Sequence, residues 1–458
     1  MLRPVVLAAL LALVAAACSD GQGADGTSDV DGGADADGGA DAGGDADADA
    51  DATFTLGPIV RLSDTPTPSQ TFLNTGKCVA VDEAGAVHVV WLEIISGDAG
   101  GHAGQGQVFY SRSDDGGTTF AAPVPLTAVV ADVGMPKIAV ARGSVFVTWH
   151  QSDGWRVQIR LARSDDGGDT WTAIPLSLGQ GTFPSLDAWS DGTGDPSVHV
   201  AWSDSQNAEN HCEIYLANSF DGGRTFDAPV MVSSPDGLSS WTASVASWGP
   251  VVHVAWTDER FNVDAAGLPY DCIVVAGGVT CHEEEFYRRS TDGGATFPEP
   301  EVRLTSDPPG APQWSWAPSV AAWRDDVHIV FFDARSGSFQ LYYRRSRDAG
   351  ATWEEERNLT GALVPQPVHW WRPSLAASGD HLQLAFWEVD LDGGSSAWTM
   401  MSLDAGATWS APLLISDGPT ALQPAVALSP SGTAHFAWYD SLDGNDEMFY
   451  RRLTRDAP

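Results

Sequence analysis

The chain has 458 residues and a formal net charge of −37, from 61 acidic side chains against 24 lysines and arginines. This acidic excess argues against nucleic acid and anionic lipid surfaces as partners. The length could hold two or three average domains, although closed all-β folds often run long as one domain.

Residues 1–17 predict an export signal. Arg3 precedes an apolar run from Val5 to Ala17, which is too short, and too abruptly followed by polar sequence, to be a spanning helix. The stretch Ala15-Ala-Ala-Cys18 resembles a bacterial lipobox, in which the cysteine thiol is lipidated; ordinary cleavage after Ala17 is the alternative. Ser19, rather than an Asp, follows the cysteine, and this resembles lipoproteins that are transported to an outer membrane. We therefore expect the protein in the cell envelope, in contact with the membrane only through a lipid on Cys18.

Residues 18–53 are dominated by Gly, Ala and Asp and contain no aromatic side chain before Phe54. Such a segment cannot bury enough apolar surface to offset its ordering entropy, so it predicts a disordered, self-repelling tether. Asp47-Ala-Asp-Ala-Asp51 alternates carboxylates and raises the alternative of calcium binding. No twelve-residue loop with a closing Glu is present, so we expect no cofactor.

From Phe54 onward, the sequence alternates short strands with turns. A small apolar strand such as Ala243-Ser-Val-Ala246 is followed by one ending like His253-Val-Ala-Trp256, and then by one like Phe286-Tyr-Arg-Arg289. A fourth strand, Pro300-Glu-Val-Arg-Leu-Thr305, follows the next turn. The pattern predicts units of four antiparallel strands with period-two side chains.

The turn between the third and fourth strands carries the pattern Ser-x-Asp-x-Gly-x-Thr-(Phe/Trp), as in Ser290 to Phe297. The Asp carboxylate can accept backbone N–H bonds inside a tight turn, and the Gly supplies a positive φ. The first serines of the copies lie 51, 55, 71, 56 and 56 residues apart, a period that fits a four-stranded propeller blade. We expect a structural role for the six aspartates of this pattern: Asp115, Asp166, Asp221, Asp292, Asp348 and Asp404.

This pattern resembles the Asp-box, or BNR repeat, of sialidase-like β-propellers. The resemblance covers residues 54–458 and implies an all-β domain, a β-propeller of four-stranded blades with Asp-box turns. The last strand set lacks an outer strand, and Pro58-Ile-Val-Arg-Leu-Ser63 resembles residues 300–305, so we predict that the N-terminal strand closes the ring. Seven blades are predicted, with six, the usual sialidase number, as the alternative; the sets begin near Gly76, Gly134, Thr182, Ser240, Gln313, His369 and Ala421.

Long insertions occur only in turns between second and third strands, which marks that face as the expected binding face. On it, most second strands end with an acid. Repetition favours a structural role for this acid ring, although a cation, a basic ligand or sugar hydroxyls are alternatives. Three of the acids are the candidates for a two-acid glycoside hydrolase: Asp258, Asp333 and Glu388.

Residues that break the repeat on the same face are the other binding candidates. Arg260 and Arg335 occupy equivalent positions, and Arg372 enters the next inner strand. Arginine forks bind carboxylates, and tryptophan faces stack on sugar rings. The alternative is that these side chains plug the centre of the ring and pair with its acids. The candidate tryptophans are Trp241, Trp314, Trp316, Trp370 and Trp371.

Sialidases of this family use three arginines, an acid/base Asp and a Tyr activated by Glu. Their Phe/Tyr-Arg-Ile-Pro motif is absent here, and Trp371-Arg-Pro373 is the nearest stretch. We therefore assign no catalytic residue. The expected function is glycan or envelope-protein binding by a monomer; an exo-acting glycoside hydrolase, sialidase or other, and a protein-interaction scaffold are the alternatives.

Four cysteines follow Cys18, and an even number in an exported chain favours disulfides. Cys272 and Cys281 lie in one insertion and are the predicted pair. Cys78 and Cys212 fall in different units, so either a disulfide or free buried thiols fits the sequence.

Overall fold

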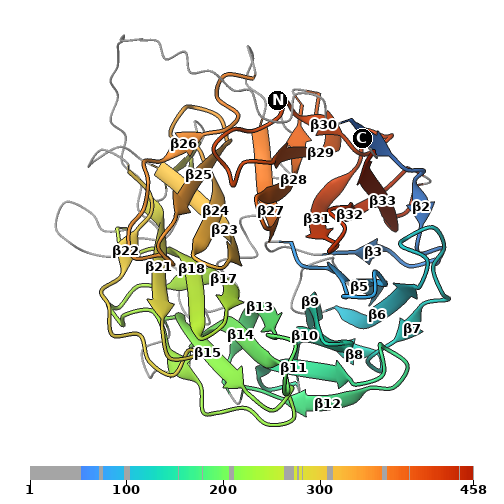
Figure 1. The fold of residues 1–458 in the computed structure, drawn as a ribbon, viewed down its shortest axis with the longest axis horizontal. Coiled ribbons are helices and arrows are strands. Elements are labelled where there is room, and N and C mark those ends of the chain that lie inside the picture. Colours follow the sequence, from blue (N-terminus) through green and yellow to red (C-terminus); the bar gives the residue numbers. More distant parts are fainter. Residues whose placement is uncertain are drawn as a thin grey trace.

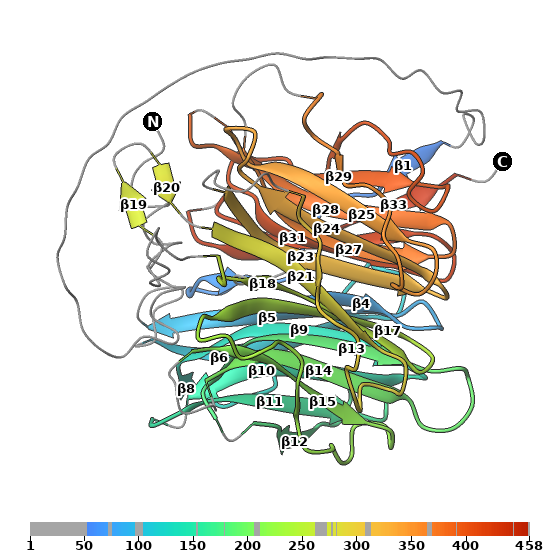
Figure 2. The ribbon, with the colours of Figure 1, turned by 90° about the vertical axis from the view of Figure 1, so that its left-hand side faces the viewer.

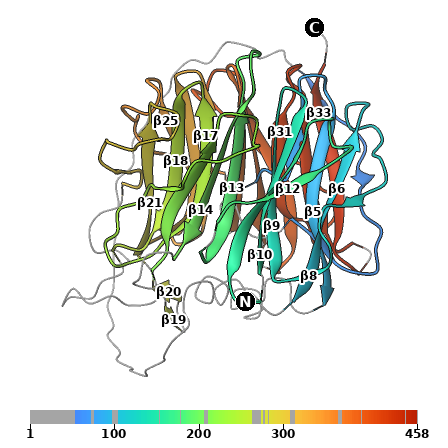
Figure 3. The same cartoon turned by 90° about the horizontal axis from the view of Figure 1, so that it is seen from below.

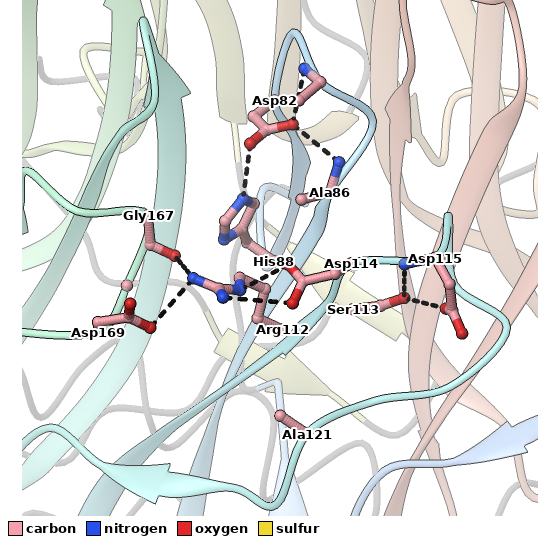
Figure 4. Close-up of polar contacts among 12 residues, drawn as sticks. Asp82, Ala86, His88, Arg112, Ser113, Asp114, Asp115, Ala121, Gly167 and Asp169 are labelled. Atoms are coloured by element: carbon pink, nitrogen blue, oxygen red, sulfur yellow. Dashed lines mark hydrogen bonds and ion pairs between the residues drawn. The ribbon is translucent and has the colours of Figure 1, made fainter.

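The repeated turn is held by hydrogen bonds within one short segment of chain. In the copy that begins at Ser113, the hydroxyl of Ser113 donates to Asp115 Oδ1 over 2.7 Å (Figure 4). The Gly117 amide donates back to Ser113 Oγ over 2.8 Å, and the Thr119 amide donates to Asp115 Oδ1 over 2.8 Å. Because these bonds span at most four residues, the sequence pattern alone can form the turn. The Gly-to-Ser bond recurs in the copies that begin at Ser164, Ser219, Ser290, Ser346 and Ser402.

The computed structural model describes most of the chain from Thr53 onward. The export signal, Cys18, Cys272 and Cys281 lie outside the described residues. The described ranges are 53–71, 76–96, 104–152, 154–177, 179–205, 211–261, 273–275, 278–280, 282–306, 313–363, 369–390, 392–442 and 444–456.

All regular structure in these ranges is β, in 33 strands. The strands form antiparallel sheets arranged around a central axis, each running from an inner strand near the axis to an outer one (Figure 1). Seen from the side, the sheets stand next to one another around that axis (Figure 2). No helix in the described ranges is long and apolar enough to cross a membrane.

The sheets follow chain order. The first contains β3 (Ser69–Gln70), β4 (Val79–Val81), β5 (Val87–Ser96), β6 (Gln105–Ser113), β7 (Val124–Pro125) and β8 (Val130–Ala131). The second contains β9 (Val133–Ala141), β10 (Ser144–Ser152), β11 (Val157–Ser164) and β12 (Thr172–Pro175), and the third contains β13 (Gly181–Trp189), β14 (Ser197–Asp204), β15 (Glu213–Ser219) and β16 (Val230–Met231).

The fourth set contains β17 (Ser240–Trp248), β18 (Val251–Asp258), β21 (His282–Ser290) and β22 (Val302–Arg303). The fifth contains β23 (Gln313–Trp323), β24 (Asp326–Asp333), β25 (Gln340–Ser346) and β26 (Arg357–Asn358). A short parallel pair between β21 and β23 joins these two sets. The hairpin β19 (Ile273–Val275) and β20 (Gly278–Thr280) follows β18 and precedes β21 in the chain, and it lies beyond the ends of the strands on one side of the ring (Figure 3). The next sheet contains β27 (His369–Ser378), β28 (His381–Val389), β29 (Ser395–Ser402) and β30 (Leu413–Leu414).

The first and last strands of the described chain share one sheet. This sheet holds β31 (Leu422–Leu428), β32 (Ala434–Asp440) and β33 (Glu447–Arg455). β1 (Phe54–Leu56) pairs antiparallel with residues 453–455 of β33, and β2 (Val60–Arg61) pairs with residues 449–450. The N-terminal strands therefore cover the outer edge of β33, an edge that would otherwise expose unpaired backbone groups.

Neighbouring sheets meet through a repeated contact of His, Tyr and Gly. His253 Nδ1 on β18 lies 2.7 Å from the Tyr287 hydroxyl on β21. A Cβ at Gly350, in the turn after β25, would overlap that hydroxyl, and Gly350 has a φ of 80°. This glycine is required both by its backbone and by the neighbouring sheet. Equivalent Tyr and Gly pairs are Tyr110 with Gly168, Tyr343 with Gly406, and Tyr450 with Gly117.

Arginine adds a second link between sheets next to the same turns. Arg112 on β6 donates to the Gly167 carbonyl over 2.6 Å and lies 3.2 Å from Asp169, both in the turn between β11 and β12 (Figure 4). Arg452 on β33 donates to the Gly116 carbonyl over 2.8 Å, which connects the last sheet to the first turn. These turns therefore hold adjacent sheets together.

Candidate functional site

The acids that end the second strands bind groups of their own sheets. Asp258 accepts from the Ser240 hydroxyl over 3.1 Å and from the Trp256 indole over 3.0 Å. The same relation of indole and acid two residues apart joins Trp91 to Glu93 and Trp202 to Asp204, each over 2.8 Å. A carboxylate bonded in this way fastens the end of its strand. Glu388 is half-buried at the end of β28, where burial raises its pKa.

Arg260 and Arg335 each bind acids next to their own strand. Arg260 contacts Asp258 over 2.6 Å and lies over the Phe286 ring at 3.9 Å, and it also contacts Glu301 and Asp236. Arg335 contacts Asp333 and Glu356, each over 2.6 Å, and lies over the Tyr342 ring at 4.3 Å. Both arginines therefore connect a second strand to the segment that leads into the outer strand. The structure does not bring them together with Arg372.

Four of the five candidate tryptophans meet in one buried cluster between β23 and β27. Trp314 and Trp371 both pack against Phe339, with ring centroids 5.1 and 4.3 Å away. Trp316 and Trp370 belong to the same cluster. Trp241 packs instead against Phe183 of the preceding sheet, at 6.1 Å. All five side chains are at most 7% exposed, so in this structure their ring faces pack against protein.

A repeated bulge shapes the inner strands near the axis. In six of the described inner strands one residue has a positive φ; Arg372 in β27, with a φ of 46°, is one of them. Two residues after the bulge, a serine accepts the backbone N–H of the next inner strand: Leu375 donates to Ser319 over 3.0 Å, and Val426 donates to Ser374 over 3.1 Å. The residues at these positions therefore surround the axis.

Three basic side chains converge at these inner positions, and we call Lys77, Lys137 and Arg372 the axial cluster. Lys137 stands two residues after the bulge of β9, where β13, β17, β23 and β27 carry serine. Lys77 Nζ reaches carbonyls of two other inner strands, those of Leu186, over 3.1 Å, and Val245. Burial lowers the pKa of Lys137 to about 8, the nearby Cys78 opposes this shift, and the positive charges of Arg372 and Lys77 add to it.

Arg372 is deeply buried against an aromatic ring. Its side chain is 3% exposed and lies over the Trp316 ring, with the guanidinium carbon 4.7 Å from the ring centroid. Nε and both Nη atoms have no hydrogen-bond partner among the described residues. Burial lowers the pKa of Arg372 to about 9, and the neighbouring Tyr439 opposes this shift.

The turn aspartates and the cysteines have local roles. Hydrogen bonds from Ser290 and Thr296 lower the pKa of Asp292 to about 2. Cys78 is a buried free thiol, and Cys212 is disulfide-bonded. In the described part of the chain no group of three His, Cys, Asp or Glu could hold a metal ion.

Comparison with known proteins shows which known fold the chain resembles. No model of a known protein family matches the chain. A *Bacteroides fragilis* (strain YCH46) protein named sialidase is 26% identical over 290 residues, which cover 56% of this chain and 48% of that protein. The structure of a polysaccharide lyase of family PL25, an ulvan lyase bound to -[GlcA(1-4)Rha3S]-, matches over 86% of this chain and 95% of its own, at 12% identity and a TM-score of 0.55. The described chain has a sialidase-like β-propeller fold.

The chain spans about half the length of its curated relative. Within the propeller, sequence reasoning singled out Arg372 and Trp316, which the structure brings together, but it missed Lys77 and Lys137. One signal was available: these are the only two lysines in the chain, and both stand at the start of predicted inner strands. Their convergence could not be read from the sequence because they belong to different blades.

Proposed function

We propose that this protein is an envelope-tethered propeller that binds glycans at the centre of its ring. The observation that carries the proposal is the axial cluster, three basic side chains gathered at the inner strands of a chain with a net charge of −37. Two named proteins support a sugar ligand: the ulvan lyase bound to an oligosaccharide and the *B. fragilis* sialidase. The proposed ligand class includes glycans of the surrounding envelope, with an envelope protein as the alternative.

The proposed architecture has seven blades with Asp-box turns. The pairing of β1 and β2 with β33 supports closure of the ring by the N-terminal strands. We further propose an export signal over residues 1–17, lipidation of Cys18, a tether over residues 18–53 and a propeller over residues 54–458. The protein is proposed to act as a monomer without a cofactor, at the outer membrane or cell surface.

A glycoside hydrolase is the second candidate, because the curated relative is named sialidase. A buried acid gives it a structural basis: burial raises the pKa of Glu285 well above its usual range, and the Thr257 hydroxyl donates to it over 3.1 Å. Burial thus favours the protonated form of this carboxyl, and a protonated carboxyl can donate a proton to a leaving group. Asp258 and Asp333 fit this role less well, since each is paired with an arginine.

A glycan array that also reports release of terminal sugars tests the proposal. The full chain, purified in detergent, is applied with and without calcium, and the same chain after unfolding is the control. Binding without release, unchanged by calcium, is the expected result. Release of a terminal sugar would replace binding with hydrolysis as the function. Neither binding nor release on any glycan would contradict both functions.

A further inference from the structure

A pocket of about 520 Å³ lies between the segment that follows β2 and the strands β5 and β6 of the first sheet. This volume falls within the range of about 300–1,000 Å³ that is typical of small-molecule sites. Trp91 and Phe109 form its aromatic side, with ring centroids 6.1 Å apart, and Glu93 and Asp64 bring carboxylates to it. Because β2 is an outer strand, the pocket lies towards the rim of the ring and away from its axis (Figure 1).

In two other sheets an arginine side chain lies over the ring that corresponds to Phe109. Phe109, Phe286 and Tyr342 are equivalent, because each pairs with the aromatic residue that stands two positions before the acid of the second strand. The guanidinium carbon of Arg260 lies 3.9 Å from the centroid of the Phe286 ring, and that of Arg335 lies 4.3 Å from the centroid of the Tyr342 ring. The fold therefore has a place for a cation over this ring, and two of its sheets fill that place from within.

Two differences in sequence leave this place open in the first sheet. Both arginines stand two residues after the acid of their second strand, whereas Ile95, which is 39% exposed, stands two residues after Glu93. The arginines also contact a glutamate just before the outer strand, Glu301 or Glu356, and the equivalent position is held by Pro123, which lines the pocket. The first sheet thus keeps the ring and the acid but lacks the arginine.

Glu93 is a buried acid whose hydrogen-bond donors in the described part of the chain are all neutral. Its carboxylate accepts from the Thr65 and Thr67 hydroxyls over 2.8 and 2.9 Å, from the Ser69 hydroxyl over 2.6 Å and from the Trp91 indole over 2.8 Å. The corresponding acids of the two other sheets each contact their arginine in addition to neutral donors. The negative charge of Glu93 is therefore hydrogen-bonded but not neutralised by these four donors.

The charged residues that line the pocket carry a net negative charge. Arg61 lines it as well, but it contacts both Glu447 and Asp64 over 3.0 Å. Glu447 is almost fully buried, so its charge offsets that of Arg61, while the Asp64 side chain is 89% exposed. The acidic field of the whole chain, with its net charge of −37, attracts cations to the same place.

We propose that this pocket, which we call the rim slot and define by Asp64, Glu93 and Phe109, binds a guanidinium group of an arginine side chain or a small molecule. The group lies with its face against Phe109 and donates to Asp64, while Glu93 contributes its negative charge. A guanidinium group stacks on aromatic faces and donates two parallel hydrogen bonds to a carboxylate, so it uses both features of the slot. The inference does not depend on the proposed glycan binding, because it concerns a different part of the ring.

Two compounds of nearly the same shape test the slot. N-acetylarginine amide carries the guanidinium group, and N-acetylcitrulline amide is its neutral counterpart. Calorimetry at low ionic strength measures the affinity of each for the full chain in detergent. We expect the arginine compound to bind and the citrulline compound to bind at least tenfold more weakly. A pentapeptide with one central arginine distinguishes the sources: tighter binding than the single residue indicates a polypeptide partner, and equal affinity indicates a small molecule.

Ile95→Arg should fill the slot from within, because its side chain begins at the position equivalent to Arg260 and Arg335. The variant should therefore bind the arginine compound at least tenfold more weakly than wild type. Ser96→Arg is the matched control, since it adds the same charge at the next exposed residue and should keep the affinity of wild type. An unfolding temperature of Ile95→Arg at or above that of wild type shows that the loss of binding does not come from misfolding.

Asp64→Asn keeps the test decisive if Ile95→Arg fails to fold. It removes an exposed carboxylate and should weaken binding of the arginine compound by up to about fivefold. Asp227→Asn, which removes an exposed acid outside the pocket, is its control and should bind like wild type.

Three results would overturn the rim slot. They are equal affinities of wild type for the arginine and citrulline compounds, no binding of either compound, and undiminished binding of the arginine compound by Ile95→Arg. Equal losses in Ile95→Arg and Ser96→Arg would assign the effect to net charge and would overturn it as well. None of these results changes the outcome of the glycan array.

Discussion

At the scale of single residues, burial favours the protonated form of the Glu213 carboxyl group. Glu213 on β15 is 1% exposed and accepts from the Ser233 hydroxyl over 2.5 Å. Burial raises its pKa to about 8, which the bond from Ser233 opposes, while the negative charges of Asp236 and Asp258 raise it further. A group whose pKa is raised by folding contributes stability that is complete below its unfolded pKa of 4.5 and is lost as the pH rises through about 8.

Glu213→Gln should remove this part of the pH dependence. The amide cannot ionise, so the variant should lose less stability than wild type between pH 5 and pH 8. Glutamine fits here because Gln340 occupies the equivalent position on β25, opposite Asp333 as Glu213 lies opposite Asp204. The free energy of unfolding from urea titrations at the two pH values provides the comparison. Equal losses of unfolding free energy in wild type and variant would show that Glu213 has the same pKa in the folded and unfolded states.

At the scale of elements, the contact between a third strand and the next turn holds neighbouring blades together. Tyr287 of β21 bonds to His253. Its ring packs edge-on against Trp353, which lies between β25 and β26 of the next blade, with centroids 4.8 Å apart. The same hydroxyl occupies the space where a side chain at Gly350 would begin. Each such turn is thus shaped by its own sequence and fixed in place by the preceding blade.

Gly350→Ala should therefore destabilise the fold by about 3 kcal/mol, from the positive φ and the overlap with Tyr287 together. Gly337→Ala is the matched control, since Gly337 has a φ of 84° and no atom within 4 Å of the added carbon. It should cost only about 1 kcal/mol, from the backbone conformation. Both values come from urea unfolding.

Tyr287→Phe tests the cause of this difference. Added to Gly350→Ala, it removes the overlapping hydroxyl and should recover part of the lost stability, although alone it leaves His253 without its bond. Strict additivity of the two changes would mean that the hydroxyl is not the source of the strain.

At the scale of the whole molecule, the two ends of the described chain complete one sheet. Leu62 is 7% exposed, and its amide donates to the Met448 carbonyl over 2.8 Å. Ser63 accepts the Met448 amide over 2.8 Å and donates to Glu447. These contacts, with the β1 and β2 ladders, join sequence positions nearly 400 residues apart.

Deleting residues 54–63 from the full chain should lower the unfolding temperature by about 5 °C or more, because it exposes the edge of β33 and removes a buried leucine. A deletion of ten residues from the Gly, Ala and Asp stretch, 30–39, is the control. Calorimetry measures both. An unfolding temperature equal to that of the control would mean that the N-terminal strands contribute little to the stability of the ring.

Much of the fold was predictable because its signals are local. The Ser113 to Asp115 turn needs only bonds within five residues, and the period of these turns gives the length of a blade. The candidate site was predicted less well. Arg260 and Arg335 look like ligand-binding forks in the sequence, but their partners Glu301 and Glu356 lie 41 and 21 residues further along the chain and contact them only in the folded blade.

The all-β class, the repeating strands and the turns follow from the amino-acid sequence, because each depends on neighbours within a few residues or on a regular period. Tertiary structure alone decided which polar groups meet. It buried four of the five candidate tryptophans in one cluster, paired two arginines with acids of their own blades, and gathered Lys77, Lys137 and Arg372 at the axis. Those residues come from three different blades, and only the packing of the inner strands around one axis brings them together.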